Sequence, residues 1–178
     1  FTPTVTLSGT GSIADYNATS TFYALTISST GVVTASSTFA MDNALTVNSS
    51  GNLSPGNGTV TMNNGSSISN SGTLVFNNLA VAASATVTSG SSFSVGGVLM
   101  VNSSGNLSPS AGTITMTGGS ITNSGTLAFN NLSIAGSVTA NSNFTVAGDL
   151  TASSGTLSGT GDLTINGGDV TGDGTINM

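Results

Sequence analysis

Apolar and polar residues alternate in short runs along the whole chain, and Gly, Ser and Asn separate the runs. An apolar-x-apolar motif followed by a small or polar residue occurs ten times, starting at Val5, Leu25, Leu45, Val60, Leu79, Leu99, Ile114, Leu132, Leu150 and Leu163. Alternation with a period of two is typical of strands with one buried face. Most motif starts lie 15 to 20 residues apart, too close for a strand-helix-strand crossover. The pattern predicts an all-β chain in which each interval forms one rung of strands and turns.

Two further sets of apolar residues follow the motif in a constant order. The second set is Ile13, Val33, Leu53, Ile68, Val87, Leu107, Ile121, Val138, Leu157 and Val170, and the third is Phe22, Phe39, Phe76, Phe93, Phe129, Phe144 and Met178. Stacked rungs would place each set in one column at the ~4.8 Å spacing of paired strands. We therefore predict a three-sided parallel β-solenoid, or β-helix, of about ten rungs and on the order of 48 Å in length. The pattern leaves its hand open, and a β-sandwich is the rival interpretation.

A longer repeat lies over the short one. The segment VNSSGNLSP from Val47 returns from Val101, 54 residues later, and NSGTL from Asn70 returns from Asn123, 53 residues later. We expect one domain over residues 1–178, with a partial unit at 1–21 and long repeats at 22–75, 76–128 and 129–178. The third apolar set has no member near Ser54-Pro55 and Ser108-Pro109, so we expect those rungs to cut a corner. Glycines such as Gly51, Gly72, Gly105 and Gly125 are expected to supply positive φ at the turns.

The charge balance narrows the function. The chain has no Lys, Arg or His, and its formal charge of −6 comes from six aspartates. Without cations it cannot neutralise phosphates, which argues against nucleic acid and anionic membrane surfaces as partners. No apolar run reaches the ~20 residues that span a bilayer, so no membrane insertion is expected. A chain without trypsin-like cleavage sites that starts at Phe1 rather than Met suits an extracellular or cell-surface location.

The candidate chemistry is sparse. Nucleophilic catalysis needs a base beside Ser or Thr, and His, Lys, Cys and Glu are absent. We therefore expect no catalytic residue, no enzymatic activity and no cofactor. Asp149, Asp162, Asp169 and Asp173 are close in sequence, and turn aspartates that oppose aggregation are the simplest interpretation. A weak calcium site at Asp169 and Asp173 is a secondary possibility, because residues 167–174 partly match a Gly-Asp-rich calcium repeat.

Two surface patterns suggest ligands. Thr4 and Thr6, Thr59 and Thr61, and Thr113 and Thr115 flank an inward residue, as in Thr-x-Thr solenoids that bind ice, but intervening motifs carry Ala, Asn or Val in these places. Ice binding is therefore kept as an alternative below the structural hypotheses. Glycans are possible partners, at Asn-x-Ser/Thr sequons that include Asn17, Asn48, Asn52, Asn102, Asn106 and Asn131.

A family resemblance follows from the repeats. The run FNNLSIAGSVTANSNFTVAGDLTASSGTL from Phe129 resembles the β-strand repeats of large bacterial surface proteins, the filamentous-haemagglutinin-like and autotransporter-passenger β-helices. The resemblance covers nearly the whole chain and is one of repeat style. It implies a β-helix and a role in fibrous stalks, adhesins or filaments.

The two ends of the chain suggest how such a fibre would assemble. The segment from Val5 already reads as a rung, and the last residues continue the long repeat, with Ile165 at the place of Met116 and Met178 at that of Phe129. Rungs without caps expose apolar columns and unpaired backbone, which invite a further strand. We expect Phe1, Val5, Leu7, Val170, Ile176 and Met178 to form the assembly ends of a homopolymer that stacks end to end. The alternative is a stalk segment of a larger surface adhesin.

Overall fold

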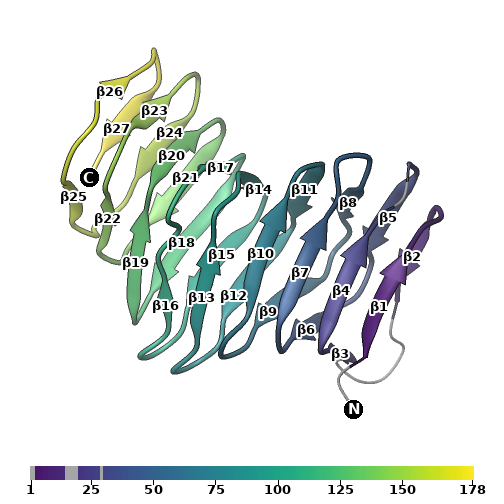
Figure 1. Cartoon of the computed structure of the whole chain (residues 1–178). Helices are drawn as coiled ribbons and strands as arrows, with labels where there is room; N and C mark the ends of the chain where they lie inside the picture. Colours follow the sequence, from purple (N-terminus) through teal and green to yellow (C-terminus); the bar gives the residue numbers. More distant parts are fainter. Residues whose placement is uncertain (1–2, 15–19, 29) are drawn as a thin grey trace.

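Every regular element in the described residues is a β-strand. The computed structural model describes residues 3–14, 20–28 and 30–178, and these form 27 strands in three sheets (Figure 1). Successive strands enter the three sheets in turn, and every strand pairs in parallel with the strand three places along the chain. The predicted three-sided parallel β-solenoid is thereby confirmed. We call the three sheets the first, second and third faces, and three successive strands a rung.

Each face contains nine short strands. The first face contains β1 (Thr4–Leu7), β4 (Ala24–Ile27), β7 (Ala44–Val47), β10 (Ser67–Asn70), β13 (Thr86–Ser89), β16 (Asn106–Leu107), β19 (Thr126–Phe129), β22 (Phe144–Val146) and β25 (Leu163–Ile165). The second contains β2 (Gly11–Ile13), β5 (Val32–Ala35), β8 (Asn52–Pro55), β11 (Thr73–Phe76), β14 (Phe93–Val95), β17 (Thr113–Met116), β20 (Asn131–Ile134), β23 (Leu150–Ala152) and β26 (Val170–Thr171). The third contains β3 (Ser20–Phe22), β6 (Phe39–Met41), β9 (Thr59–Met62), β12 (Asn78–Val81), β15 (Val98–Val101), β18 (Gly119–Asn123), β21 (Ser137–Ala140), β24 (Thr156–Ser158) and β27 (Thr175–Asn177).

The described residues form nine rungs, where the motif count predicted about ten. Partners in neighbouring rungs lie about twenty residues apart, as in the pairs Leu25 with Leu45 and Leu79 with Leu99. Several motif intervals are shorter than this turn, because the motif moves to another face between them. Val60 lies on the third face, for example, whereas Leu45 lies on the first. Counting motifs therefore overestimates the number of turns.

The long sequence repeat contains eight strands, whereas three whole rungs would contain nine. The strands β1, β9, β17 and β25 match one another in sequence, with TVTL, TVTM, TITM and LTI, and they lie on the first, third, second and first faces. Since a rung takes three strands, an eight-strand unit is one strand short of three rungs. Equivalent strands therefore move by one face from unit to unit. Three units restore the starting face after eight rungs.

This mismatch corrects two sequence predictions. The three apolar sets do not form one column each, because every set changes face with the long repeat. No corner is cut at Ser54-Pro55 or Ser108-Pro109 either. The second-face strand β8 is followed by β9 on the third face, and the first-face strand β16 by β17 on the second. The sequence gap in the phenylalanine set marks the point at which the repeat advances by one face.

The phenylalanines form one edge-to-face pair on each face. Ring centroids are 5.6 Å apart for Phe22 and Phe39 on the third face, and 5.5 Å for Phe76 and Phe93 on the second. Phe129 and Phe144 form the corresponding pair on the first face, at 5.6 Å. The rings meet diagonally, because Phe22 lies opposite Met41 in the strand register. Edge-to-face contacts of this kind add to the free energy gained by burial.

One apolar core runs through the rungs. Inward side chains of all three faces are buried, from Ile13 and Leu25 at the first rungs to Leu150 and Leu157 near the last. Their outward neighbours are mostly Ser, Thr and Asn, in agreement with the predicted alternation. Because each rung buries its side chains only against its neighbours, the stability of the solenoid is close to a sum over stacked rungs.

Glycines permit the corners of successive rungs to approach closely. Gly51, Gly72, Gly105 and Gly125 do not have the predicted positive φ, which occurs instead at Gly65, Gly112, Gly119, Gly159, Gly168 and Gly172. A Cβ on Gly72 would lie 2.3 Å from the carbonyl oxygens of Asn48 and Gly51, and one on Gly125 would lie 2.2 Å from that of Gly105. The requirement for glycine at these corners is therefore steric rather than conformational.

Candidate functional site: the end rungs

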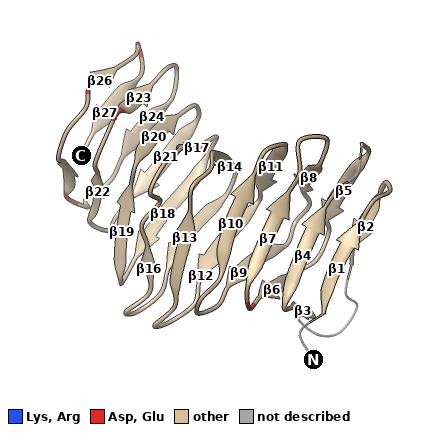
Figure 2. Ribbon diagram, in the orientation of Figure 1, with Lys and Arg blue, Asp and Glu red and all other residues tan. Residues whose placement is uncertain are grey.

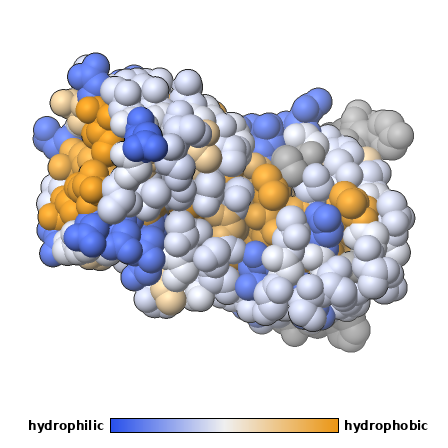
Figure 3. All heavy atoms as spheres, turned by 90° about the horizontal axis from the view of Figure 1, so that it is seen from above, coloured by the Kyte–Doolittle hydropathy of each residue, from blue (hydrophilic) through white to orange (hydrophobic). Residues whose placement is uncertain are grey.

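The C-terminal rung exposes apolar side chains on all three faces. It consists of β25, β26 and β27, each the last strand of its sheet. Ile165 is 37% exposed, Val170 54%, Ile176 37% and Met178 38%. Figure 3 shows an apolar patch with a hydrophilic rim at this end of the molecule. Apolar side chains of this size are usually covered when they gather in one place.

These side chains continue the buried columns of the core. Val170 is the register partner of Leu150, Ile176 of Leu157, and Ile165 of Val146, and all three partners are fully buried. The C-terminal rung therefore has the inward side chains of a core rung without a further rung above it in the described chain.

The N-terminal rung is the opposite end of the same core. It consists of β1, β2 and β3, the first strands of the three sheets. Val5, Leu7 and Phe22 are partly buried and pack against the core, and Ile13 is buried. The two end rungs lie at opposite ends of the solenoid, as Figure 1 shows.

The predicted assembly residues divide between these two rungs. Val5 and Leu7 point inward on β1, whereas Val170, Ile176 and Met178 are exposed at the C-terminal rung. Phe1 lies outside the described residues. The predicted set of assembly residues omitted Ile165, Ile13 and Phe22, which also belong to the end rungs. The alternation within each strand could have identified Ile165, but the strand register was needed to place Phe22 beside β6.

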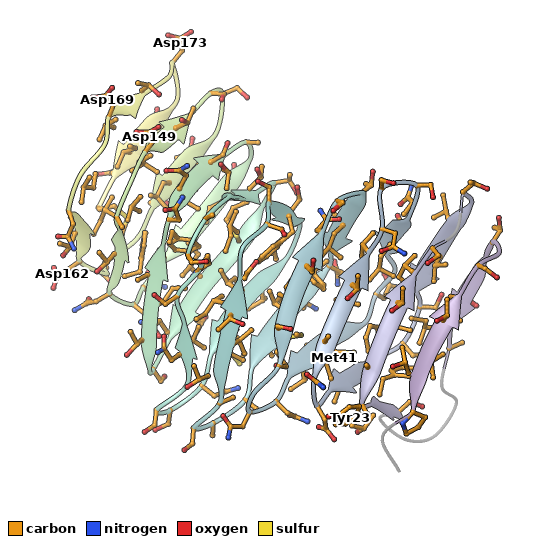
Figure 4. All side chains as sticks on the ribbon, viewed as in Figure 1. Tyr23, Met41, Asp149, Asp162, Asp169 and Asp173 are labelled. Carbon is orange, nitrogen blue, oxygen red and sulfur yellow. The ribbon has the colours of Figure 1, made fainter. Side chains whose placement is uncertain are left out.

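The C-terminal aspartates are spread over three corners of the solenoid. Figure 2 shows the acidic residues gathered toward the C-terminal rungs, and Figure 4 labels four of them. Asp162 precedes β25, Asp149 and Asp169 precede β23 and β26, and Asp173 lies between β26 and β27. Among the described residues, no group of three or more His, Cys, Asp or Glu side chains could hold a metal ion. Asp169 and Asp173 flank the two-residue strand β26, and calcium binding there stays a prediction.

The side chains of Asn131 and Asp149 each accept a hydrogen bond from the backbone of the next rung. The N–H of Asp149 donates to Oδ1 of Asn131 at 2.8 Å, and the N–H of Asp169 donates to Oδ1 of Asp149 at 3.0 Å. The side chains of Asn131 and Asp149 thus form a ladder up one corner, which ends at the N–H of Asp169. Such side-chain-to-backbone bonds satisfy N–H groups at the turns between strands.

The threonine pairs that suggested ice binding are not neighbours. Thr4 and Thr6 lie on the first face, Thr59 and Thr61 on the third, and Thr113 and Thr115 on the second. A different hydroxyl row, missed in the sequence, runs up the second face through Ser94, Thr115, Ser133, Thr151 and Thr171. The Oγ1 atoms of Thr151 and Thr171 are 3.3 Å apart, within hydrogen-bonding distance. The row is one residue wide and forms part of the polar outer surface.

Shallow hollows lie on the outer surface of the described residues. One, of about 260 Å³, lies over β11, β14 and β17 and is lined mainly by Ser, Thr and Asn, without a carboxylate. Another, of about 330 Å³ near the C-terminal rungs, contains Asp162 as its one carboxylate. General acid and base catalysis on sugars uses two carboxylates across the scissile bond, and neither hollow provides such a pair.

The sequons within the described residues occupy turns and outward strand positions. Asn48 is exposed, and its Nδ2 donates to Oγ of Ser28 at 2.7 Å. The side chain of Asn131 belongs to the corner ladder, and Oδ1 of Asn106 is buried. Asn17 lies outside the described residues. Of these positions Asn48 offers an amide nitrogen at an exposed corner, and glycosylation stays a prediction.

Comparison with known proteins gives no match: no protein-family model, no curated protein and no solved structure is similar to this chain. The described part of the chain also contains no helix that is long and apolar enough to cross a membrane.

Proposed function

We propose that the chain is a structural subunit of an extracellular filament or cell-surface fibre, and that it assembles head to tail through its two end rungs. One observation carries the proposal. The apolar columns of the core end in uncovered side chains at the C-terminal rung, on all three faces at once. Covering them with the first rung of another copy would extend the core and the three sheets together.

The composition supports the location and the structural role. A chain without Lys or Arg presents no trypsin-like cleavage site, which suits exposure outside the cell. Asp149 and Asp169 share one corner, where the Asp149 carboxylate accepts the N–H of Asp169, and Asp162 and Asp173 lie at the other two corners. The proposed role requires neither an enzyme site nor a cofactor. The repeats resemble those of bacterial surface β-helices, and we propose that this chain also belongs to a bacterial surface fibre.

A stalk segment of a larger surface adhesin is the second candidate. The same exposed columns favour it, since a following rung of one longer chain would cover them equally well. The two candidates differ in a measurable property. A self-assembling subunit associates with other copies of residues 1–178, whereas a stalk segment needs further chain.

Sedimentation velocity over a range of concentrations tests the proposal. Wild type should form long species that grow with concentration. The variant Val170→Asp with Ile176→Asp places charge on inward positions of the end rung and should stay monomeric, because burying an unpaired carboxylate is unfavourable. The matched control, Thr171→Asp with Asn177→Asp, adds the same charge at neighbouring positions that face outward and should still associate. A monomeric wild type would refute the self-assembly proposal and favour the stalk.

A further inference from the structure

We propose that two copies of the chain meet in one register, without rotation about the solenoid axis: β25 pairs with β1 of the next copy, β26 with β2 and β27 with β3. This inference rests on the proposed head-to-tail function and specifies its interface. It follows from the phase of the strands at the two ends and from the side chains that would come together.

The number of strands determines the face on which the next copy must begin. The described chain begins with a strand on the first face and ends, after 27 strands, with one on the third. A further strand would therefore lie on the first face, which is where β1 of the next copy begins. A copy rotated forward by one face would leave β25 uncovered. A copy rotated backward would place its β1 in the layer that β27 already occupies.

The first face supplies matched apolar pairs in this register. Leu163 and Ile165 are the inward residues of β25, and Val5 and Leu7 are those of β1. Stacking the two strands would continue the columns that already pair Phe144 with Leu163 and Val5 with Leu25. The junction would repeat the contacts of an internal rung.

The second and third faces match by size. On the second face, Val170 would meet Gly11, and Ile13 would lie over Gly172. Within the chain Gly11 already pairs with Val33, and Ile13 with Ala35, which is the same alternation of large and small. On the third face Ile176 would meet the small Ser20, and Met178 would meet Phe22, which already pairs with a methionine, Met41, within the chain. Exposed Val170 and Ile176 would thus be covered without two large side chains competing for one place.

The strands that would pair at the junction carry no charge. The described strands β1, β2 and β3 contain no ionisable side chain, and the aspartates of the C-terminal rung lie at its corners. Apolar contact and main-chain pairing would therefore stabilise the junction, as they do between internal rungs.

Cysteine cross-linking tests the register directly, because the chain contains no natural cysteine. Thr6→Cys with Thr164→Cys joins outward positions on the first face, and Ser12→Cys with Thr171→Cys does so on the second. In the proposed register each pair lies on adjacent strands about 4.8 Å apart, within the Cα separation that a disulfide allows. Thr6→Cys with Thr171→Cys is the matched control, since these outward positions meet only if one copy is rotated forward by one face.

The expected result is a ladder of covalent oligomers on non-reducing gels for both in-register pairs, and monomer for the control pair. Cross-linking of the control pair, or fibres in the electron microscope without cross-linking of either in-register pair, would overturn the register and leave the fibre proposal standing. Absence of any oligomer, by cross-linking and by sedimentation of the wild type, would overturn both.

Discussion

At the residue scale, close contact between corners is the strictest requirement that this solenoid places on its sequence. Gly72 lies against the backbone of the preceding rung, whereas Gly9 has no atom within 4 Å of the place of a Cβ. A methyl group is thus excluded at one glycine and accommodated at the other. The difference comes from packing between rungs and is invisible in the local sequence of either glycine.

Gly72→Ala should destabilise the protein by about 1–3 kcal/mol, the usual range for overpacking a tight site. The reason is that the new Cβ would collide with the carbonyl oxygens of Asn48 and Gly51, which cannot move without disturbing their rung. Urea unfolding followed by circular dichroism measures the effect, with Gly9→Ala as the control of near-native stability. Equal midpoints for the two variants would contradict the steric account.

At the element scale, the eight-strand sequence unit and the three-strand turn determine different properties of a strand. The unit determines which kinds of strand stack on each other, and the turn determines the face on which a strand lies. Strands that stack on each other are three apart in the chain. We call strands at the same position of the eight-strand unit strands of one kind, and in every unit strands of the same two kinds stack on each other. Deleting one whole unit would therefore keep every stacking neighbour of the same kind, even though later strands move to another face. Deleting one whole turn would keep the faces and change the neighbours.

Removal of residues 59–112, which is the unit from β9 to β16, should leave a folded solenoid. Removal of residues 59–77, which is the turn from β9 to β11, should lower stability more, although it removes fewer residues. In the variant that lacks residues 59–77, β6 would stack on β12 instead of on a strand equivalent to β9. Thermal melts by circular dichroism compare the two, and a higher melting temperature for the turn deletion would show that the face, and not the sequence unit, determines stacking.

The mismatch between the eight-strand unit and the three-strand turn explains which parts of the fold could be predicted from the sequence. Inward and outward positions follow from alternation within each strand, and so the solenoid, its three sides and most of its core could be predicted. Alternation says nothing about the face on which a strand lies. Leu45 and Val60 look equivalent in sequence, yet they lie on the first and third faces. Only the pairing between rungs, about twenty residues apart, resolves this.

The candidate site was partly predictable for a related reason. Val170, Ile176 and Met178 could be identified because they continue a repeat near the end of the chain. Phe22 required the register, and the dispersal of the aspartates over three corners required the positions of the strands. Closeness in sequence, as between Asp162, Asp169 and Asp173, does not give closeness in space when the chain turns at each strand.

At the scale of the whole molecule, charge and apolar contact act in opposite directions on assembly. Every copy has a formal charge of −6, and none has a Lys, Arg or His to offset it. Repulsion between copies is screened by salt, with a Debye length of about 30 Å at 0.01 M and about 3 Å at 1 M. The apolar contact between end rungs does not depend on such screening.

Self-association should therefore increase with salt. Sedimentation velocity at about 0.01 M and about 0.5 M NaCl measures this, and the average size of the wild-type species should be greater at the higher concentration. The double variant Val170→Asp with Ile176→Asp serves as control and should stay monomeric in both. Association that weakens with added salt would indicate that attraction between charges, rather than apolar stacking, holds the copies together.

The most direct test of the account is electron microscopy of residues 1–178 at increasing concentrations. If end rungs stack in the way that internal rungs do, thin unbranched fibres should form, with an axial repeat of about 43 Å for nine rungs at ~4.8 Å each. Monodisperse rods one subunit long at every concentration would contradict the claim that the exposed columns of the C-terminal rung are covered by another copy.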